Sequence, residues 1–418
     1  MSELFVCRQP ILNRYKETIG YELLYRAVAT DTRANISDGN SATSLVFLNT
    51  LFEMGLKSIV GSQVAYINFT RDFLLKDDLI QLLAGIRTEN FDPSKVILEV
   101  MEDITLDADL FQALIRFKAK RFQIALDDVT SIDQIAPVLG LGLVEIVKVD
   151  MMAVDRTLLP NLVQAIKQYD VQLLAEKVET PKDFLTCLDL GFDFFQGYFF
   201  HKPEIVKDKK KKMDVSQLSL IRSLAAIMSP RANFRVLEPI ISQDVGFSYK
   251  LLRLVNSGYY SMAGKVTSIQ QAISMVGLQQ LRGWMMLLLM TAVDDKPHEL
   301  TAIALQRAKM CELLGNVLGD RQPESYFLIG LLSVLDAIMD LPMLEVVESL
   351  SLSTEIMEAL VYRKGTLGQI LSGVIEGEGG NWDNVLRLGF KPDVWQNKFF
   401  ESAKWSNIIM TEVYADSR

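Results

Sequence analysis

The chain reads Ile-Ala-Leu-Asp-Asp-Val-Thr over residues 124–130, a short apolar run that ends in two adjacent aspartates. An apolar run of this length predicts a buried strand, which places Asp127 and Asp128 at its carboxyl end. Adjacent carboxylates repel each other, and a fold tolerates them best where a cation lies between them. A solvated turn is the alternative interpretation, because Asp favours turns. The rest of the first half of the chain decides between the two.

Short apolar or alternating runs recur through this half of the chain. They cover residues 4–7, 19–25, 64–68, 96–100, 122–126, 144–149, 171–175 and 194–199. Most are separated by segments with helical spacing, such as Leu110–Phe117, in which apolar positions recur every three or four residues. Strands that alternate with helices predict a parallel sheet, and this number of strands suggests a barrel. Periodicity alone leaves a doubly wound sheet open.

Polar side chains stand at the ends of these runs, where barrel enzymes place their chemistry. They are Glu22, Asn68, Glu99, Glu102, Lys148, Asp150, Glu176, Glu179 and Gln196. For any one of them a surface salt bridge is the simpler explanation, but so many carboxylates together would repel one another without a cation. Oxygen ligands suit Mg²⁺ or Mn²⁺, and a chain with only two histidines offers little for zinc. The set predicts a divalent-metal site, and a pair of metals there would activate water for attack on a phosphodiester.

Composition sets the broad class of protein. With 418 residues and 49% hydrophobic content, the chain is expected to form two domains. A net charge of −9 and a pI near 5.1 argue against a nucleic-acid polymer as partner. Because no apolar stretch is long enough to span a membrane, we expect no membrane contact and a cytoplasmic location. Cys7, Cys187 and Cys311 are far apart in sequence, which predicts buried thiols.

A lysine-rich stretch divides the chain. Residues 206–213 hold five lysines, and such a run extends the chain and disfavours packing. We therefore expect a barrel over 1–205, a linker over 206–213 and a helical domain over 214–418. Within that domain Ser268 is predicted to cap a helix that begins at Ile269, and Leu300–Leu318 to form a helix that ends before Gly319. The apolar segment Trp284–Met290 predicts core, with a binding surface as the alternative.

Eight short motifs in the first 205 residues follow a family pattern in order and approximate spacing. They are Gln9–Ile11, Gly20–Arg26, Ile67–Asn68, Glu99–Glu102, Asp127–Asp128, Lys148–Asp150, Ala175–Thr180 and Gln196–Tyr198. In these motifs the chain resembles EAL domains, a family of cyclic di-GMP phosphodiesterases. The resemblance implies a TIM-like α/β barrel, two Mg²⁺ or Mn²⁺ ions, and water attack on cyclic di-GMP to give linear pGpG.

The resemblance also implies a role for each matching residue. By position, the ligands of a first metal are Glu22, Asn68, Glu99 and Asp127. Asp128 and Glu176 help to hold a second metal, and Glu176 joins Lys148 as a catalytic residue. Lys148 resembles the residue that positions or deprotonates the attacking water. Gln9, Arg26, Glu179 and Gln196 resemble residues that contact the dinucleotide or support the second metal, and Glu102 supports the adjoining loop.

The chain departs from the family pattern at three places. The name-giving triplet reads Glu22-Leu-Leu, residues 129–133 replace a glycine-bearing loop, and Lys177 stands where the family has glycine. Loss of the loop glycines stiffens a segment that in the family shapes the second metal site and part of a homodimer interface. We therefore expect cyclic di-GMP and metal binding with weak or conditional hydrolysis. The alternative is a non-catalytic receptor or scaffold.

The second half carries a second resemblance. Leu251–Tyr260, Ile269–Gly277 and Leu328–Leu335 are similar to motifs of HDOD domains, helical relatives of the HD hydrolases. Ser333-Val334 stands where an HD hydrolase has His-Asp, so an HD metal centre cannot form, and His298 is predicted to be an exposed loop residue. The tandem order resembles bacterial EAL-HDOD signalling proteins. It implies that the helical domain relays the state of the barrel to an unidentified protein partner.

Overall fold

The structure is a computed structural model of the 418-residue chain. It describes residues 4–27, 56–76, 92–101, 104–200, 215–228, 237, 245–256, 266, 268–291, 293, 296–320, 322–350 and 352–415. The chain divides into two compact units. The first unit comprises Met1–Phe199 with Glu378–Trp382 and Lys391–Gln396, and the second comprises Phe200–Gly377, Asp383–Phe390 and Asn397–Arg418. The lysine-rich stretch 206–213 lies outside the described residues.

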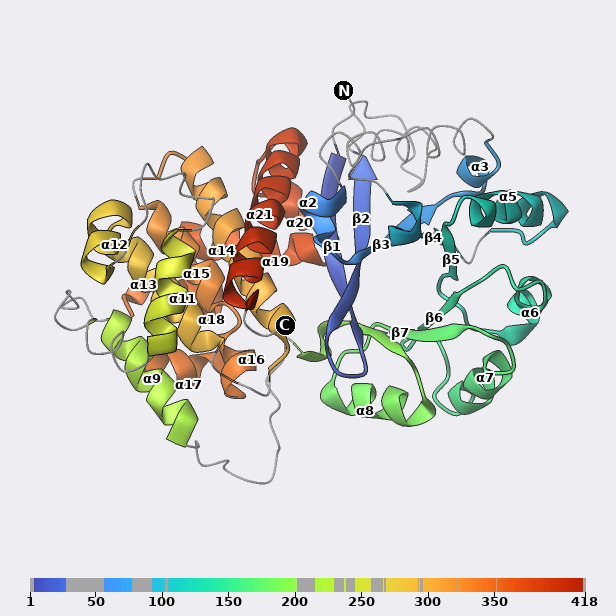
Figure 1. Ribbon diagram of the computed structural model, residues 1–418, viewed down its shortest axis with the longest axis horizontal. Coiled ribbons are helices and arrows are strands. Elements are labelled where there is room, and N and C mark those ends of the chain that lie inside the picture. Colours follow the sequence, from blue (N-terminus) through green and yellow to red (C-terminus); the bar gives the residue numbers. More distant parts are fainter. Residues whose placement is uncertain are drawn as a thin grey trace. The chain divides into compact units, whose positions relative to one another are not determined.

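The first unit is built on a closed barrel of eight strands that neighbour one another in chain order (Figure 1). The strands are β1 (Leu4–Asn13), β2 (Thr18–Ala27), β3 (Val64–Phe69), β4 (Val96–Val100), β5 (Gln123–Leu126), β6 (Ile146–Asp150), β7 (Gln172–Glu176) and β8 (Phe194–Gln196). Each predicted apolar run overlaps one of them. The barrel prediction is confirmed, and the doubly wound alternative is wrong.

One strand departs from the predicted parallel sheet. β1 pairs antiparallel with both β2 and β8, while the pairs from β2 to β8 are parallel. The reason is local, because only residues 14–17 separate β1 from β2. A connection that short joins antiparallel strands, whereas a parallel pair needs a crossover of about a dozen residues or more. Gln9 on β1 consequently lies opposite Glu22 on β2.

Helices lie on the outside of the strands (Figure 1). They are α2 (Leu56–Val60), α3 (Arg71–Leu74), η1 (Pro93–Lys95), α5 (Ala108–Ala119), α6 (Ile132–Gly140), α7 (Leu159–Ile166), α8 (Pro181–Leu190) and η2 (Tyr198–Phe200). In α5 the predicted apolar stripe is buried at Leu110, Leu114 and Phe117. The carboxylate of Asp107 begins this helix by accepting from the backbone N–H of Leu110 at 3.0 Å.

Beyond residue 214 the described chain is helical, as predicted. The helices are α9 (Val215–Met228), α11 (Val245–Val255), α12 (Ile269–Val276), α13 (Leu278–Met290), α14 (His298–Val317), α15 (Pro323–Leu332), α16 (Leu335–Met339), α17 (Met343–Glu348), α18 (Thr354–Tyr362), α19 (Gly365–Glu378), α20 (Trp382–Leu386) and α21 (Pro392–Val413). Ser268 caps α12 by accepting from the backbone N–H of Gln271 at 3.1 Å. Gly319 follows α14 with φ of 74°. Among the described residues, no helix has the length and apolar character needed to cross a membrane.

The core of the second unit contains the methionine-rich helix α13. Trp284, Met285 and Leu287 are at most 1% exposed, which confirms the core interpretation of this segment. Helix α14 packs against α15 at Gly330, where an added Cβ would lie 2.5 Å from the Cα of Ala308. His298 is exposed as predicted, but it begins α14 rather than lying in a loop, and its ring stacks on Tyr414.

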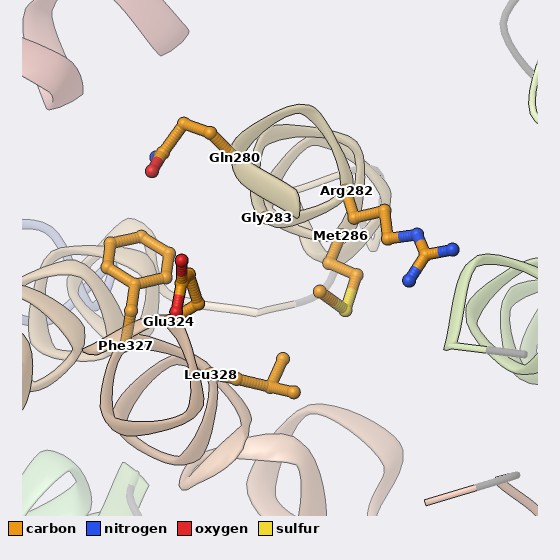
Figure 2. Close-up of a pocket in the computed structure, with 7 residues that line it drawn as sticks. All are labelled: Gln280, Arg282, Gly283, Met286, Glu324, Phe327 and Leu328. Atoms are coloured by element: carbon orange, nitrogen blue, oxygen red, sulfur yellow. The ribbon is translucent and has the colours of Figure 1, made fainter. Parts of the chain in front are cut away.

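A small cavity lies between α13 and α15. Figure 2 shows Met286 and Gly283 on one side of it and Phe327 and Leu328 on the other. Its volume of about 60 Å³ is far below the ~300–1,000 Å³ of typical small-molecule sites. Gly283 permits this close helix contact, because a Cβ there would lie 3.1 Å from the ring of Phe327. We assign no ligand to this cavity.

Candidate functional site

The barrel interior changes from apolar to polar between one inward-facing residue and the next along the strands. Its apolar layer consists of Ile11, Tyr66, Ile97, Ala125, Ile146 and Leu174, with Ile19, Val64 and Phe194 packed against it. Side chains two residues apart on a strand point to the same face. Stepping two residues toward the carboxyl ends of the parallel strands, and back along β1, gives the next inward layer on every strand but β2, where Glu22 follows Gly20 by two residues and lies opposite Gln9. This polar layer comprises Gln9, Glu22, Asn68, Glu99, Asp127, Lys148, Glu176 and Gln196. Eight of the predicted site residues thus share one layer.

Lys148 lies at the centre of the polar layer with none of its side chain exposed. Its Nζ is 2.5 Å from Glu99 Oε1, 2.8 Å from Asp127 Oδ1 and 2.9 Å from Glu176 Oε1. Glu22 Oε2 is more distant, at 3.6 Å. One ammonium therefore faces four carboxylates. Four ionised carboxylates would exceed the charge of this one ammonium, and a further cation would neutralise the difference.

The acid–base properties of the layer follow from this burial. Burial raises the pKa of Glu99 and that of Glu176 well above the usual glutamate value, although Lys148 opposes both shifts. Burial alone would lower the pKa of Lys148, but Asp127 and the neighbouring glutamates outweigh it and hold that pKa above its usual value. The lysine is therefore a fixed cation.

Hydrogen bonds orient the remaining members of the layer. Asn68 donates from Nδ2 to Glu22 Oε1 at 2.9 Å, and Gln196 donates from Nε2 to Glu22 Oε2 at 2.7 Å. The same Gln196 nitrogen lies 3.0 Å from Gln9 Oε1. Both Glu22 oxygens are thus held in place by amides of neighbouring strands.

Several oxygen atoms in this layer have no hydrogen-bond partner. Among the described residues, they include Asn68 Oδ1, Glu99 Oε2 and Glu176 Oε2, all of them buried. Buried polar atoms are normally satisfied, so unpaired ones need an explanation. One oxygen each from Glu22, Glu99 and Asp127 lie within 4.8 Å of one another. These oxygens fit a hard divalent cation, and Asn68 Oδ1 would complete the donor set.

The segment that follows Asp127 stays hydrogen-bonded to the barrel. Asp128 has φ of 47°, and the backbone N–H of Val129 donates to the Lys148 carbonyl at 2.9 Å. Val129 is buried, and Ser131 begins α6 by accepting from the backbone N–H of Asp133. The segment that replaces the glycine-bearing loop is therefore anchored at both ends.

Two residues at the edge of the layer had no individual role in the sequence-based prediction, because Asp150 was only one of the strand-end polar residues and Lys177 only a departure from the family pattern. Asp150, at the end of β6, is 6% exposed and accepts from the backbone N–H of Met152 at 2.6 Å. Lys177 follows Glu176 and places its Nζ 2.5 Å from Asp150 Oδ2 and 3.4 Å from Asp128 Oδ1. The sequence showed Asp150 as an aspartate at a strand end and Lys177 as a lysine in place of glycine. It did not show that the two side chains pair.

Three predicted site residues are not placed in the polar layer. Glu179 follows β7 in a half-buried turn that precedes α8. Arg26 belongs to β2, but its side chain lies outside the described part of the structure. Glu102 also lies outside the described residues.

Comparison with known proteins defines the class. The EAL domain model matches residues 2–203 and the HDOD domain model matches residues 218–358. The chain belongs to the family of proteins in which an EAL domain is followed by an HDOD domain.

Two relatives align along nearly the whole chain. The cyclic di-GMP phosphodiesterase CdgJ of Vibrio cholerae is 32% identical over 421 residues, which cover 98% of this chain and 94% of that protein. The uncharacterized protein YuxH of Bacillus subtilis is 29% identical over 416 residues, covering 97% and 99%. Among solved structures, the B. subtilis YkuI protein, which has an EAL domain and is in complex with cyclic di-GMP and calcium, is 16% identical. That match covers 66% of this chain and 71% of that chain with a TM-score of 0.39.

Proposed function

We propose that the barrel binds cyclic di-GMP together with Mg²⁺ or Mn²⁺ and hydrolyses one 3'-5' phosphodiester to give linear pGpG at a low or conditional rate. The observation that carries this proposal is Asn68 Oδ1, which has no hydrogen-bond partner in the described part of the chain, together with the close oxygens of Glu22, Glu99 and Asp127. The name of the Vibrio cholerae relative supports the choice of substrate.

Glu22, Asn68, Glu99 and Asp127 would hold the cation. A divalent ion there supplies a lowered pKa for a bound water and neutralises negative charge on the phosphate. The excess of carboxylates over the single Lys148 ammonium matches this requirement. The donor set offers oxygen atoms, which suits Mg²⁺ or Mn²⁺ better than zinc.

Lys148 and Glu176 would handle the water and its protons. Lys148 donates a hydrogen bond that positions the water, and its charge offsets the charge that develops on the phosphate oxygens. Glu176 accepts a proton from the water, a role suited to a carboxylate whose pKa burial has raised. The water oxygen bonds to phosphorus, the bond from phosphorus to O3' breaks, and O3' leaves with a proton from solvent.

The dinucleotide would lie across the mouth of the polar layer. Gln9 and Gln196 are hydrogen-bonded to each other and would present their amides to it. Glu179, in the turn after β7, would contact it from that side, and the guanidinium of Arg26 would bind phosphate in a bidentate manner. These contacts fix the scissile phosphodiester relative to Lys148.

A receptor that binds without cleaving is the second candidate. It is favoured by the anchored segment after Asp128, which replaces the glycine-bearing loop, and by Lys177 at the edge of the layer. In this alternative the metal ligands serve affinity for the nucleotide instead of turnover.

One experiment separates the two candidates. The full chain is incubated with cyclic di-GMP and Mn²⁺, and pGpG is measured by chromatography. We expect slow product formation that Glu22→Ala abolishes. Asp109→Ala is the matched control, because it removes an exposed carboxylate on α5 outside the polar layer. Calorimetric binding in Ca²⁺ with no product in Mn²⁺ would identify a receptor, and absence of binding would reject both candidates.

We propose that the second unit contacts a protein partner. Ser333 and Val334 replace the His-Asp pair, and Ser333 is buried with its Oγ donating to the Gly330 carbonyl at 2.7 Å. Arg307 donates to the same Oγ at 3.2 Å, so Ser333 is engaged within its own unit. The Glu22→Ala protein tests whether the second unit takes part in catalysis, because residual pGpG formation there would place catalysis in that unit.

A further inference from the structure

Lys177 brings a positive charge to the edge of the polar layer from an unusual backbone position. It follows the last residue of β7 and has φ of 54°, in the left-handed region. A residue other than glycine is strained in that region. Asn, Asp and Gly are the usual occupants of that region, so a lysine there is an exception.

The contacts of Lys177 join the ends of three strands. Its Nζ bonds Asp150 Oδ2 at 2.5 Å, at the end of β6, and lies 3.4 Å from Asp128 Oδ1, just beyond β5. Asp150 is fixed from the other side, since its Oδ1 accepts from the backbone N–H groups of Met152 and Ala153. The carboxylate therefore cannot turn away without losing these bonds.

The two aspartates are oxygen donors of the kind a second metal requires, and Asp128 is the predicted ligand of that metal. In this chain a lysine ammonium already lies against both of them. Like charges repel, so a divalent ion at Asp128 would be repelled by the Lys177 ammonium, which lies 3.4 Å from the same carboxylate. The residues present fit a first cation at Glu22, Glu99 and Asp127 but do not fit a second one beside Lys177.

We propose that the Lys177 ammonium takes the place of the second divalent cation. The barrel then binds one metal ion, and Lys177 supplies positive charge where the second ion would lie. This inference rests on the proposed function, because it assumes the first cation. Lys177 then acts as a positioning residue that holds Asp128 and Asp150, with its ammonium directed to the mouth of the barrel.

Metal stoichiometry tests the proposal without any measurement of turnover. Mn²⁺ bound to the full chain is measured by calorimetry and by equilibrium dialysis with elemental analysis, in the absence of nucleotide. We expect one Mn²⁺ for the wild type and two for Lys177→Gly, in which the backbone conformation is retained and the ammonium is removed. The double variant Lys177→Gly/Asp128→Asn should return to one, which locates the added ion.

Lys16→Gly is the matched control. Lys16 is an exposed lysine with φ of 61° in the turn between β1 and β2, so the same substitution relieves the same backbone strain. We expect it to leave one Mn²⁺ bound. Thermal unfolding of both glycine variants verifies that each is folded.

Each outcome separates this inference from the proposed function. Two Mn²⁺ bound to the wild type, or one bound to Lys177→Gly, would overturn the role of Lys177 while Glu22-dependent pGpG formation still supported the enzyme. No Mn²⁺ bound to any folded variant would overturn both proposals together.

Discussion

Asn68 on β3 donates a hydrogen bond from Nδ2 to Oε1 of Glu22 on β2, over a distance of 2.9 Å. This bond fixes the rotation of the amide, because Nδ2 is held by Glu22 and Oδ1 must then point away from that oxygen. Asn68 Oδ1 is buried and, among the described residues, has no hydrogen-bond partner. Asn68 and Glu22, both predicted metal ligands, therefore orient each other, as hydrogen-bonding neighbours orient the ligands of metal sites generally.

The first prediction concerns this amide. Asn68→Ala removes one oxygen donor and frees Glu22 to rotate, so we expect Mn²⁺ affinity to fall at least about tenfold. Calorimetric titration of the full chain measures the change. Asn161→Ala, at an exposed position on α7, is the control and should leave affinity unaltered. Equal affinities of the two variants would contradict the assignment of Asn68 as a ligand.

The second prediction concerns the buried ammonium. Lys148→Met leaves four carboxylates in the layer without their cation, and removing one partner of a buried ion pair costs about 3–5 kcal/mol. We expect a large fall in the free energy of unfolding without metal, and a larger stabilisation by Mn²⁺ than the wild type shows. Urea unfolding with and without Mn²⁺ measures both.

Lys118→Met is the control for this prediction. Lys118 pairs with Glu145 at 2.5 Å, but about a third of each side chain is exposed. A pair so open to solvent contributes roughly 1 kcal/mol or less. Similar losses from the two lysine substitutions would show that burial of Lys148 does not set its contribution.

The barrel and its polar layer could be predicted from the sequence for a physical reason. Strands that are buried on both faces appear as apolar runs, and the first polar residue beyond each run marks the strand end. Glu99 follows Ile97 by two positions, as Asp127 follows Ala125, so inward alternation carries each of them into the same layer. Periodicity alone left a doubly wound sheet possible, and the resemblance to EAL domains predicted the closed barrel.

What could not be predicted depends on contacts between strands. The direction of β1 follows from the length of one turn, and the pairing of Lys177 with Asp150 follows from how far the end of β7 extends past β6. Neither is a property of one segment. The sequence departures at Lys177 and after Asp128 pointed to the second metal site without indicating that a lysine would contact its aspartates.

The third prediction concerns the turn that positions Gln196. Gly197 has φ of 144°, and a Cβ there would lie 2.3 Å from the carbonyl oxygen of Val178. Gly197→Ala must therefore shift the backbone next to Gln196, at a cost of about 1–3 kcal/mol, and we expect weaker cyclic di-GMP binding. Gly142→Ala is the control, since it has φ of 63° but no atom within 4 Å of an added Cβ. Calorimetry should show reduced affinity for the Gly197 variant alone.

The fourth prediction concerns the thiol of Cys187 on α8, the helix that follows the turn containing Glu179. Burial raises its pKa to about 12, and the charge of Asp183 adds to this effect while that of Arg156 opposes it. Because the thiolate is the reactive species, alkylation by iodoacetamide at pH 8 should be at least about a hundredfold slower in the folded protein than in urea. A Cys7→Ser/Cys311→Ser background isolates this thiol.

The pH dependence of the same thiol has a definite sign. Since the folded pKa lies above that of the unfolded chain, the folded state holds its proton more tightly. The contribution of Cys187 to stability is therefore fully present below the unfolded pKa, near 9, and is lost as pH rises toward 12. Urea unfolding in the same background should show a steeper loss of stability above pH 9 than Cys187→Ala does. Equal slopes of stability against pH for the two proteins, or rapid alkylation of the folded protein at pH 8, would contradict this prediction. Either result would mean that α8 opens to solvent and that the turn before it is not fixed in the conformation described.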